Sequence, residues 1–286
     1  MLKSKPYYPT FPDGKQKVFT MSYDDGGEDD IPLIELIRKY GVKATFGVNS
    51  AMWSEKAEPS RPDRMSLEQV RSLYGTDMEV AMQCVWHPFW AQQKSGCLTE
   101  DNLVARRVME KRMGCPIRGS AVPCESCSSD VEQAMRLVGI EYCRIGGRVT
   151  HNLRAIPENF LRLEPTCEYS DPHLMELAEK FVTGKGLRNF QWMFCVWGQS
   201  YGHMRGNDYQ VVEDLVKYVS RRDDVWYATN IEIVDYVNAS RRLRYNLDRT
   251  FVENPTNQDI WLRTKPLSEK DPGVICIPAF GHIELG

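Results

Sequence analysis

The amino-acid sequence predicts an α/β protein, a (β/α)7 barrel of parallel strands followed by a β-rich C-terminal tail. Seven short apolar segments end where polar or glycine residues begin, which is typical of buried strands. Amphipathic stretches with helix start and stop signals separate them, and this alternation indicates parallel β/α units. Several segments also carry polar side chains at their ends. This favours a barrel, because the carboxyl ends of barrel strands meet at one rim, where the chemistry gathers.

The predicted elements follow one another in regular order. The first helical stretch, DDIPLIELIRKYG, opens with acids and a proline and closes with glycine, and the next carries a capping-box pattern from Ser66 to Gln69. Similar stretches are SSDVEQAMRLVG, DPHLMELAEKFVTG and NDYQVVEDLVKYVSRR. The predicted strands are residues 17–23, 44–49, 78–84, 119–124, 141–146, 190–196 and 225–230.

The end of the chain has a different pattern. Residues 247–286 contain prolines, turn residues and short apolar runs without a helical period. We therefore expect a barrel over residues 1–246 and a β-rich extension over 247–286 that packs on it.

Composition excludes several classes of partner. The 286 residues carry a net charge of -3 with a pI near 6.0, so neither nucleic acid nor an anionic membrane is an expected partner. No apolar run reaches the length of a membrane span, and the N-terminus shows no secretory signal, so we expect a cytoplasmic protein. Nine scattered cysteines then indicate reduced thiols. The C-x-x-C at Cys124 and Cys127 has no second pair at zinc-site spacing.

Two adjacent carboxylates, Asp24 and Asp25, follow the first predicted strand. Like charges so close oppose each other's ionisation unless a cation or strong donors intervene. A metal bound by one carboxylate would leave the other as a general base, with His87 as a further ligand. The alternative is that both residues cap the following turn and helix.

Several sequence motifs resemble those of the polysaccharide deacetylases, the family also called the NodB homology group or carbohydrate esterase family 4. TMSYDDG with LIRKYGVKATFGVN is similar to their first motif, MEVAMQCVWHPF to the second and CPIRGSAVPCESCSSDV to the third. FCVWGQSYGH resembles a segment usually written WGHSYE, and RDDVWYATNIEIVDYV resembles the closing strand and helix. The similarity runs from about residue 17 to 240 in motif order. It implies a distorted (β/α)7 barrel of the NodB type.

The resemblance also assigns roles to individual residues. Asp24 matches the general base, and Asp25 and His87 match ligands of a divalent metal, zinc or similar. The other ligand position, a histidine in the family, is Gln83 here. Three further catalytic positions complete the set: the arginine that orients the base, the backbone N–H that donates to the oxyanion, and the general acid. They fall at Arg118, Cys124 and Gln199.

The two glutamines depart from the family pattern. Because a neutral amide oxygen is a poor substitute for histidine, we expect the metal to bind weakly or not at all. Glutamine has no titratable proton, so Gln199 cannot act as general acid, although it can donate an N–H. General acid–base catalysis is worth on the order of 10²–10⁴ in rate, so low turnover is expected.

Aromatic side chains near these motifs are candidates for sugar binding, because their faces suit the apolar faces of sugar rings. Ordinary barrel packing is the alternative. The candidates are Trp86, Trp90, Trp197 and Tyr201.

Three functions remain open at this stage. The first is a hydrolase of the polysaccharide deacetylase type, acting on the N-acetyl C–N bond of a carbohydrate, with weak activity. The second is a non-catalytic sugar-binding relative. The third is a small-molecule amidohydrolase like the allantoinase branch of the family, which works without the usual metal. A carbohydrate or small amide is therefore the expected ligand, and a homo-oligomer is left open.

Overall fold

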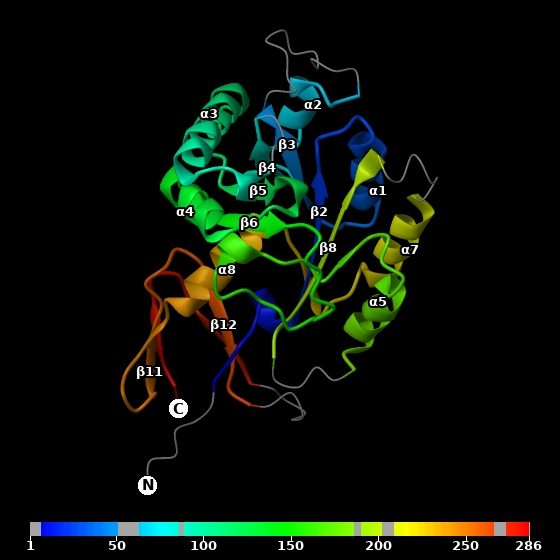
Figure 1. The fold of residues 1–286 in the computed structure, drawn as a ribbon. Coiled ribbons are helices and arrows are strands. Elements are labelled where there is room, and N and C mark those ends of the chain that lie inside the picture. Colours follow the sequence, from blue (N-terminus) through cyan, green and yellow to red (C-terminus); the bar gives the residue numbers. More distant parts are fainter. Residues whose placement is uncertain are drawn as a thin grey trace.

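The computed structural model describes residues 7–50, 63–85, 89–185, 190–201, 209–265 and 273–285. At its centre a parallel eight-stranded sheet curls into a distorted barrel (Figure 1), which confirms the predicted fold class. Its order is β6-β5-β4-β3-β2-β8-β7, and β9 also pairs with β2. The strands are β2 (Lys17–Asp24), β3 (Ala44–Asn49), β4 (Met78–Cys84), β5 (Gly119–Val122), β6 (Tyr142–Ile145), β7 (Cys167–Glu168), β8 (Trp192–Gln199) and β9 (Val225–Tyr227).

Helices cover the outside of this sheet, with α3 and α4 on one side and α1, α5 and α7 on the other (Figure 1). The capping box predicted from Ser66 to Gln69 is present at the start of α2. The helices are α1 (Asp30–Lys39), α2 (Leu67–Arg71), α3 (Ser95–Met113), α4 (Ser129–Val138), α5 (Leu174–Thr183), α7 (Tyr209–Val219) and α8 (Asn230–Arg241). Short 3-10 turns are η1 (Pro12–Gly14), η3 (Trp90–Gln92), η4 (Pro123–Glu125) and η5 (Phe160–Arg162).

Two elements were not predicted. Helix α3 begins after Lys94, which provides no side-chain cap, so its start has no sequence signal. It ends at Gly114, whose φ of 72° is the left-handed conformation expected after a helix. Strand β7 has only two residues and lies in a stretch for which no strand or helix was predicted.

The core lies on both faces of the sheet, and this explains why all eight residues of β2 are buried. Between the sheet and the outer helices lie Phe19, Leu33 and Phe46. Inside the barrel lie Val18, Ala81, Met193 and Cys195, together with Tyr236 of α8.

The C-terminal region forms two three-stranded antiparallel sheets. One contains β12 (Ile260–Arg263) and β13 (Val274–Ile277) and takes β1 (Tyr8–Pro9) from the N-terminal part of the chain. The other contains β10 (Arg244–Tyr245), β11 (Phe251–Glu253) and β14 (His282–Glu284). Ile260 packs with the residues that fill the barrel interior. The tail is β-rich as expected, while the domain boundary at residue 246 stays a prediction.

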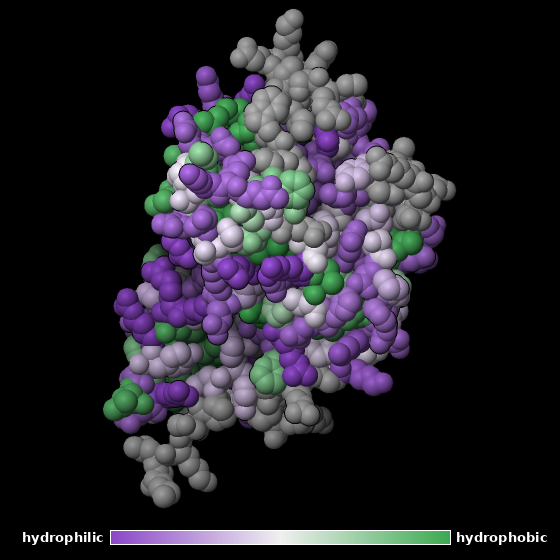
Figure 2. All heavy atoms as spheres, viewed as in Figure 1, coloured by the Kyte–Doolittle hydropathy of each residue, from purple (hydrophilic) through white to green (hydrophobic). Residues whose placement is uncertain are grey.

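Two expectations about the whole chain can be compared with the structure. None of the helices among the described residues combines the length and the apolar character that crossing a membrane requires. On the face that Figure 2 shows, hydrophilic side chains surround scattered hydrophobic ones. None of the nine cysteines, all of which lie among the described residues, forms a disulfide, and this includes Cys124 and Cys127.

Candidate functional site

The carboxyl ends of β2 and β8 bring two predicted site residues together. The strands pair in parallel, with Asp24 opposite Gln199 and Ser22 opposite Trp197. Side chains alternate along a strand, so residues two apart share a face. Since the Ser22 hydroxyl accepts a hydrogen bond from buried Arg144, these four side chains lie on the inner face of the barrel.

The turn after β2 is held in an unusual backbone conformation. Asp25 has a φ of 78° and Gly26 one of 62°, both in the left-handed region. A Cβ on Gly26 would lie 3.1 Å from Val48, so glycine suits this turn in space as well. The Asp25 N–H donates to Gln83 Oε1 at 2.9 Å, and Arg64 Nη1 donates to the Asp25 carbonyl at 2.9 Å. These bonds stabilise the turn that carries both carboxylates.

Arg144 of β6 is the cation that contacts Asp24. Its Nη2 donates to Asp24 Oδ1 and its Nε to Ser22 Oγ at 3.2 Å. Both members of this ion pair are almost completely buried, and the guanidinium lies 5.1 Å from the ring centroid of Trp197. Gly146 leaves room for this stack, because a Cβ there would meet the Trp197 ring at 3.0 Å. Arg144 therefore fixes the orientation of the Asp24 carboxylate.

The structure corrects the residue expected to orient Asp24. Arg118 lies at the start of β5, and its guanidinium pairs with Glu141 and with Asp235 of α8. The prediction of Arg118 was wrong because the order of the motifs assigns a residue to a position in the sequence. It does not show which end of the barrel the side chain of that residue reaches. The sequence did hold a signal for Arg144, since a charged residue inside a predicted buried strand needs a partner.

The Gln83 side chain already makes hydrogen bonds within the site. Its Oε1 accepts from the Asp25 N–H and also from Asn49 Nδ2 at 3.2 Å. Asn49 Nδ2 lies 3.4 Å from Asp25 Oδ1, and Asn49 Oδ1 accepts from the Cys84 thiol at 2.9 Å. The amide nitrogen of Gln83 has no lone pair for a metal. Its one ligating atom is thus already used in the turn.

The described residues therefore do not fit a divalent-metal site. Among them, no group of three or more His, Cys, Asp or Glu side chains is placed to hold a metal ion. Asp24 forms an ion pair with Arg144, and Gln83 accepts a hydrogen bond from the backbone of the turn at Asp25. His87 and the neighbouring Trp86 lie outside the described residues.

The other predicted catalytic positions lie near strand ends. The Gln199 Oε1 accepts a hydrogen bond from the Tyr201 hydroxyl, so the Gln199 amide nitrogen is the end that can donate to a ligand. Cys124 follows β5 with a φ of 51° and a ψ of 29°. Left-handed conformations are uncommon for residues other than glycine, and such strain clusters at functional sites.

Asp30, at the start of α1, is a buried carboxyl that the sequence indicated only as a helix-start acid. Burial raises its pKa well above the ordinary value of 3.8, and the charges of Asp25 and Asp24 raise it further. The nearby Ser200 hydroxyl and Arg64 oppose this rise. Within the described residues, neither carboxyl oxygen makes a hydrogen bond of good geometry.

Beside Asp24, two of the buried donors that lack partners among the described residues lie close together. They are Arg144 Nη1 and Trp197 Nε1, on side chains that stack against each other next to Asp24. Buried donors of this kind normally find an acceptor, which can belong to water or to a ligand. The other predicted aromatic residues differ: Trp90 is 1% exposed and packs in the core, whereas Tyr201 is half-buried beside Gln199.

The comparisons with known proteins agree with this fold. A family model described as "Polysaccharide deacetylase" matches residues 12–143, which contain Asp24, Asp25, Gln83 and Arg118. This stretch of the chain therefore matches the polysaccharide deacetylase family, whose motifs the sequence resembles. The comparison with curated proteins gave no match.

Solved structures show the same fold at low sequence identity. A protein described as a "putative polysaccharide deacetylase" from Mycobacterium smegmatis is 15% identical, with a TM-score of 0.60 over 84% of this chain and 96% of that one. A CE4 domain of a multidomain xylanase, from the hindgut metagenome of Trinervitermes trinervoides, is 11% identical, with a TM-score of 0.53 over 78% and 92%. A mutant CE4-family pseudoenzyme with restored enzymatic activity, from Bacillus anthracis, is 15% identical, with a TM-score of 0.50 over 82% and 72%.

Proposed function

We propose that this protein is a polysaccharide deacetylase homologue that binds an N-acetylated carbohydrate or a related amide and hydrolyses its C–N bond slowly at most. The observation that carries the proposal is the Gln83 side chain, whose Oε1 accepts from the Asp25 N–H and from Asn49. The family reaction uses a divalent metal at this position. Because Gln83 Oε1 already accepts two hydrogen bonds within the protein, it is a poor ligand for a metal ion.

Features that recognise an amide remain. Asp24 is oriented by Arg144 at the end of β2, as a general base must be. Arg144 Nη1 and Trp197 Nε1, without partners among the described residues, are buried donors that suit a carbonyl or hydroxyl oxygen. Asp24 can take a proton from water, but no described group replaces the general acid at Gln199. Binding with low turnover follows.

The test compares the natural chain with the Gln83→His/Gln199→His variant. Acetate release from chitotetraose is measured with zinc and with a chelator, and bound metal is measured after dialysis. We expect the natural chain to release acetate at least about 100-fold more slowly than the double variant with zinc. A matched control adds Asp24→Asn to the double variant, which should abolish the gain.

The outcomes separate the three functions that the sequence left open. Chitotetraose binding without acetate release in the natural chain indicates a sugar-binding relative. Rapid, chelator-resistant hydrolysis of allantoin would favour a metal-free amidohydrolase and contradict the proposal. A double variant that binds zinc no better than the natural chain would show that Gln83 is not the ligand position. The mutant pseudoenzyme from Bacillus anthracis regained activity, so this fold can undergo such a change.

A further inference from the structure

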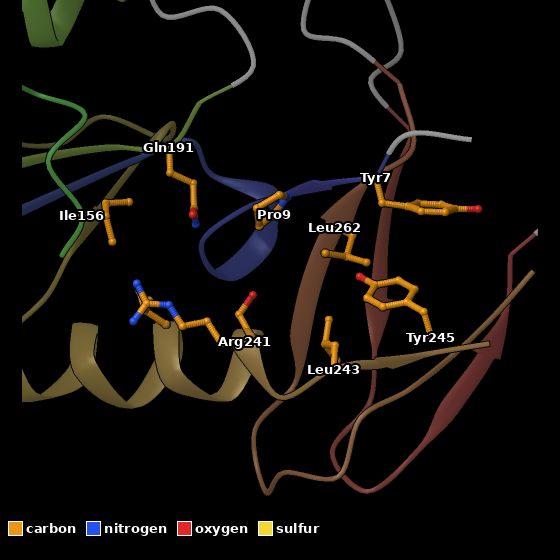
Figure 3. Close-up of a pocket in the computed structure, with 10 residues that line it drawn as sticks. Tyr7, Pro9, Ile156, Gln191, Arg241, Leu243, Tyr245 and Leu262 are labelled. Atoms are coloured by element: carbon orange, nitrogen blue, oxygen red, sulfur yellow. The ribbon is translucent and has the colours of Figure 1, made fainter. Parts of the chain in front are cut away.

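A cavity lies between the barrel and the C-terminal sheets. Its volume is about 350 Å³, within the range of small-molecule sites. Pro9 of β1 and Leu262 of β12 border it, together with the end of α8 and two segments of the barrel (Figure 3). The site around Asp24 lies instead at the carboxyl end of β2, and Asp24 is not among the residues that line this cavity.

The two sides of the cavity have different chemistry. In Figure 3, Tyr7 and Tyr245 lie on one side, and Gln191, Ile156 and Arg241 lie on the other. The two tyrosine rings are stacked with centroids 6.2 Å apart at an interplanar angle of 25°. The tyrosine side of the cavity is therefore aromatic, and the opposite side combines the polar side chains of Gln191 and Arg241 with the apolar Ile156.

The polar side offers neutral hydrogen-bonding groups. Within the described residues, the side chains of Gln191 and Ser240 make no hydrogen bond, although both line the cavity. The Arg241 guanidinium already donates to the carbonyls of Pro157 and Glu158 and packs over Phe160. No carboxylate is among the described residues that line the cavity, and these residues therefore do not suit a cation. With its guanidinium committed to carbonyls, Arg241 does not favour an anion either.

We propose that this cavity binds one residue of a neutral, gluco-configured oligosaccharide. Such a sugar presents a C–H face, which stacks on an aromatic ring, and a rim of hydroxyls, which pair with amide and hydroxyl groups. Tyr245 stacks on the C–H face, and Gln191 and Ser240 bind the hydroxyls. The C-terminal tail thereby gives the domain a second point of attachment to a glycan. This proposal does not depend on hydrolysis at Asp24.

The test is isothermal titration calorimetry of the full chain with cellotriose and chitotriose. Tyr245→Ala should weaken binding of at least one sugar about tenfold, because it removes the stacking ring. Tyr245→Phe should keep the affinity within about threefold, since the ring stays in place. Gln191→Ala should weaken binding about three- to tenfold. Tyr74→Ala removes an exposed tyrosine that does not line this cavity and should bind as the natural chain does.

Three results would overturn the proposal. One is that neither sugar binds at millimolar concentration. Another is that Tyr245→Ala binds as well as Tyr245→Phe while both keep the natural circular dichroism spectrum. The third is that Asp24→Asn alone abolishes all binding, which would place the sugar in the Asp24 site and leave the proposed function standing.

Discussion

Each end of the barrel interior holds a carboxylate, partly buried Glu79 at the amino end and buried Asp24 at the carboxyl end, and the two differ in their hydrogen-bond partners. At the amino end, Glu79 of β4 accepts from the Tyr142 hydroxyl at 2.7 Å, from the Thr45 hydroxyl at 2.8 Å and from the Ile231 N–H at 2.9 Å. At the carboxyl end, Arg144 pairs with Asp24, yet its Nη1 has no partner among the described residues. A satisfied cluster serves stability, whereas unpartnered buried groups indicate a place for a ligand or water.

The backbone shows the same contrast. At the amino end, α8 begins with a capping box between Thr229 and Glu232, a regular and stabilising helix start. At the carboxyl end, Asp25 and Cys124 adopt positive φ angles of 78° and 51°. Such conformations cost free energy and persist where the surroundings hold them, often at functional sites. The comparison indicates that the amino end of the barrel contributes stability, whereas the carboxyl end holds the candidate functional groups.

The largest expected effect is the loss of the Arg144 guanidinium. Arg144→Met should lower the free energy of unfolding by about 3–5 kcal/mol, because it leaves the buried Asp24 carboxylate without its cation. Urea denaturation at pH 7 measures this loss. A loss below about 1 kcal/mol would contradict the assignment of Arg144 as the cation of Asp24.

Arg118→Met is the matched control, since the same substitution then falls on the other candidate arginine. About a third of the Arg118 side chain is exposed, and its partners Glu141 and Asp235 are exposed to a similar degree. Exposed ion pairs contribute about 0–1 kcal/mol, so this variant should stay within about 1 kcal/mol of the natural chain. If both variants lose the same free energy of unfolding, the assignment of Arg144 rather than Arg118 as the buried cation is contradicted.

A smaller effect is expected at the amino end. Burial raises the pKa of Glu79 above the ordinary value of 4.5, and the Tyr142 hydroxyl opposes this rise. Tyr142→Phe removes that donor and should lower the free energy of unfolding by about 1.5–3 kcal/mol at pH 7, the contribution of a hydrogen bond to a charged group. Thermal unfolding from pH 4 to 8 measures it.

The pH dependence of this variant follows from the sign of the shift. A carboxyl whose pKa is raised on folding stabilises the protein fully below its unfolded pKa and loses that contribution as pH rises. Losing the Tyr142 donor raises the pKa of Glu79 further, so the deficit should grow from pH 4 to 8. A deficit that stays constant over this range would mean that Glu79 is not ionised in the natural chain.

Much of the fold could be predicted because strand ends carry strong local signals. β3 and β4 begin and end where the apolar runs 44–49 and 78–84 do. Parallel pairing then places the ends of β2 and β8 side by side, which is why Asp24 and Gln199 could be expected at one edge. These predictions needed only alternation and the polar residues that end each run.

The remaining features depend on contacts between distant segments. No local pattern distinguishes Arg144 from Arg118 as the partner of Asp24, because that pairing depends on how the sheet curls. The internal bonding of Gln83 Oε1 depends in the same way on the left-handed turn at Asp25. The joining of β1 to β12 brings residues more than 250 positions apart into one sheet.

The last effect concerns Asp30, and its direction is opposite to that expected for Arg144→Met and Tyr142→Phe. Its carboxyl is fully buried with a pKa well above 3.8, so by the same linkage it contributes stability at low pH that is lost as pH rises above 3.8. Asp30→Asn removes this titration and should raise the free energy of unfolding by at least about 1 kcal/mol at pH 7. Near pH 3.5, where the carboxyl is mostly protonated in both states, the variant and the natural chain should differ little. Asp29→Asn is the control, because Asp29 neighbours Asp30 at the start of α1 but makes no side-chain capping hydrogen bond there. If Asp30→Asn destabilises the chain at pH 7, the ionised carboxylate has a favourable partner, and the carboxyl end would then resemble the satisfied amino end.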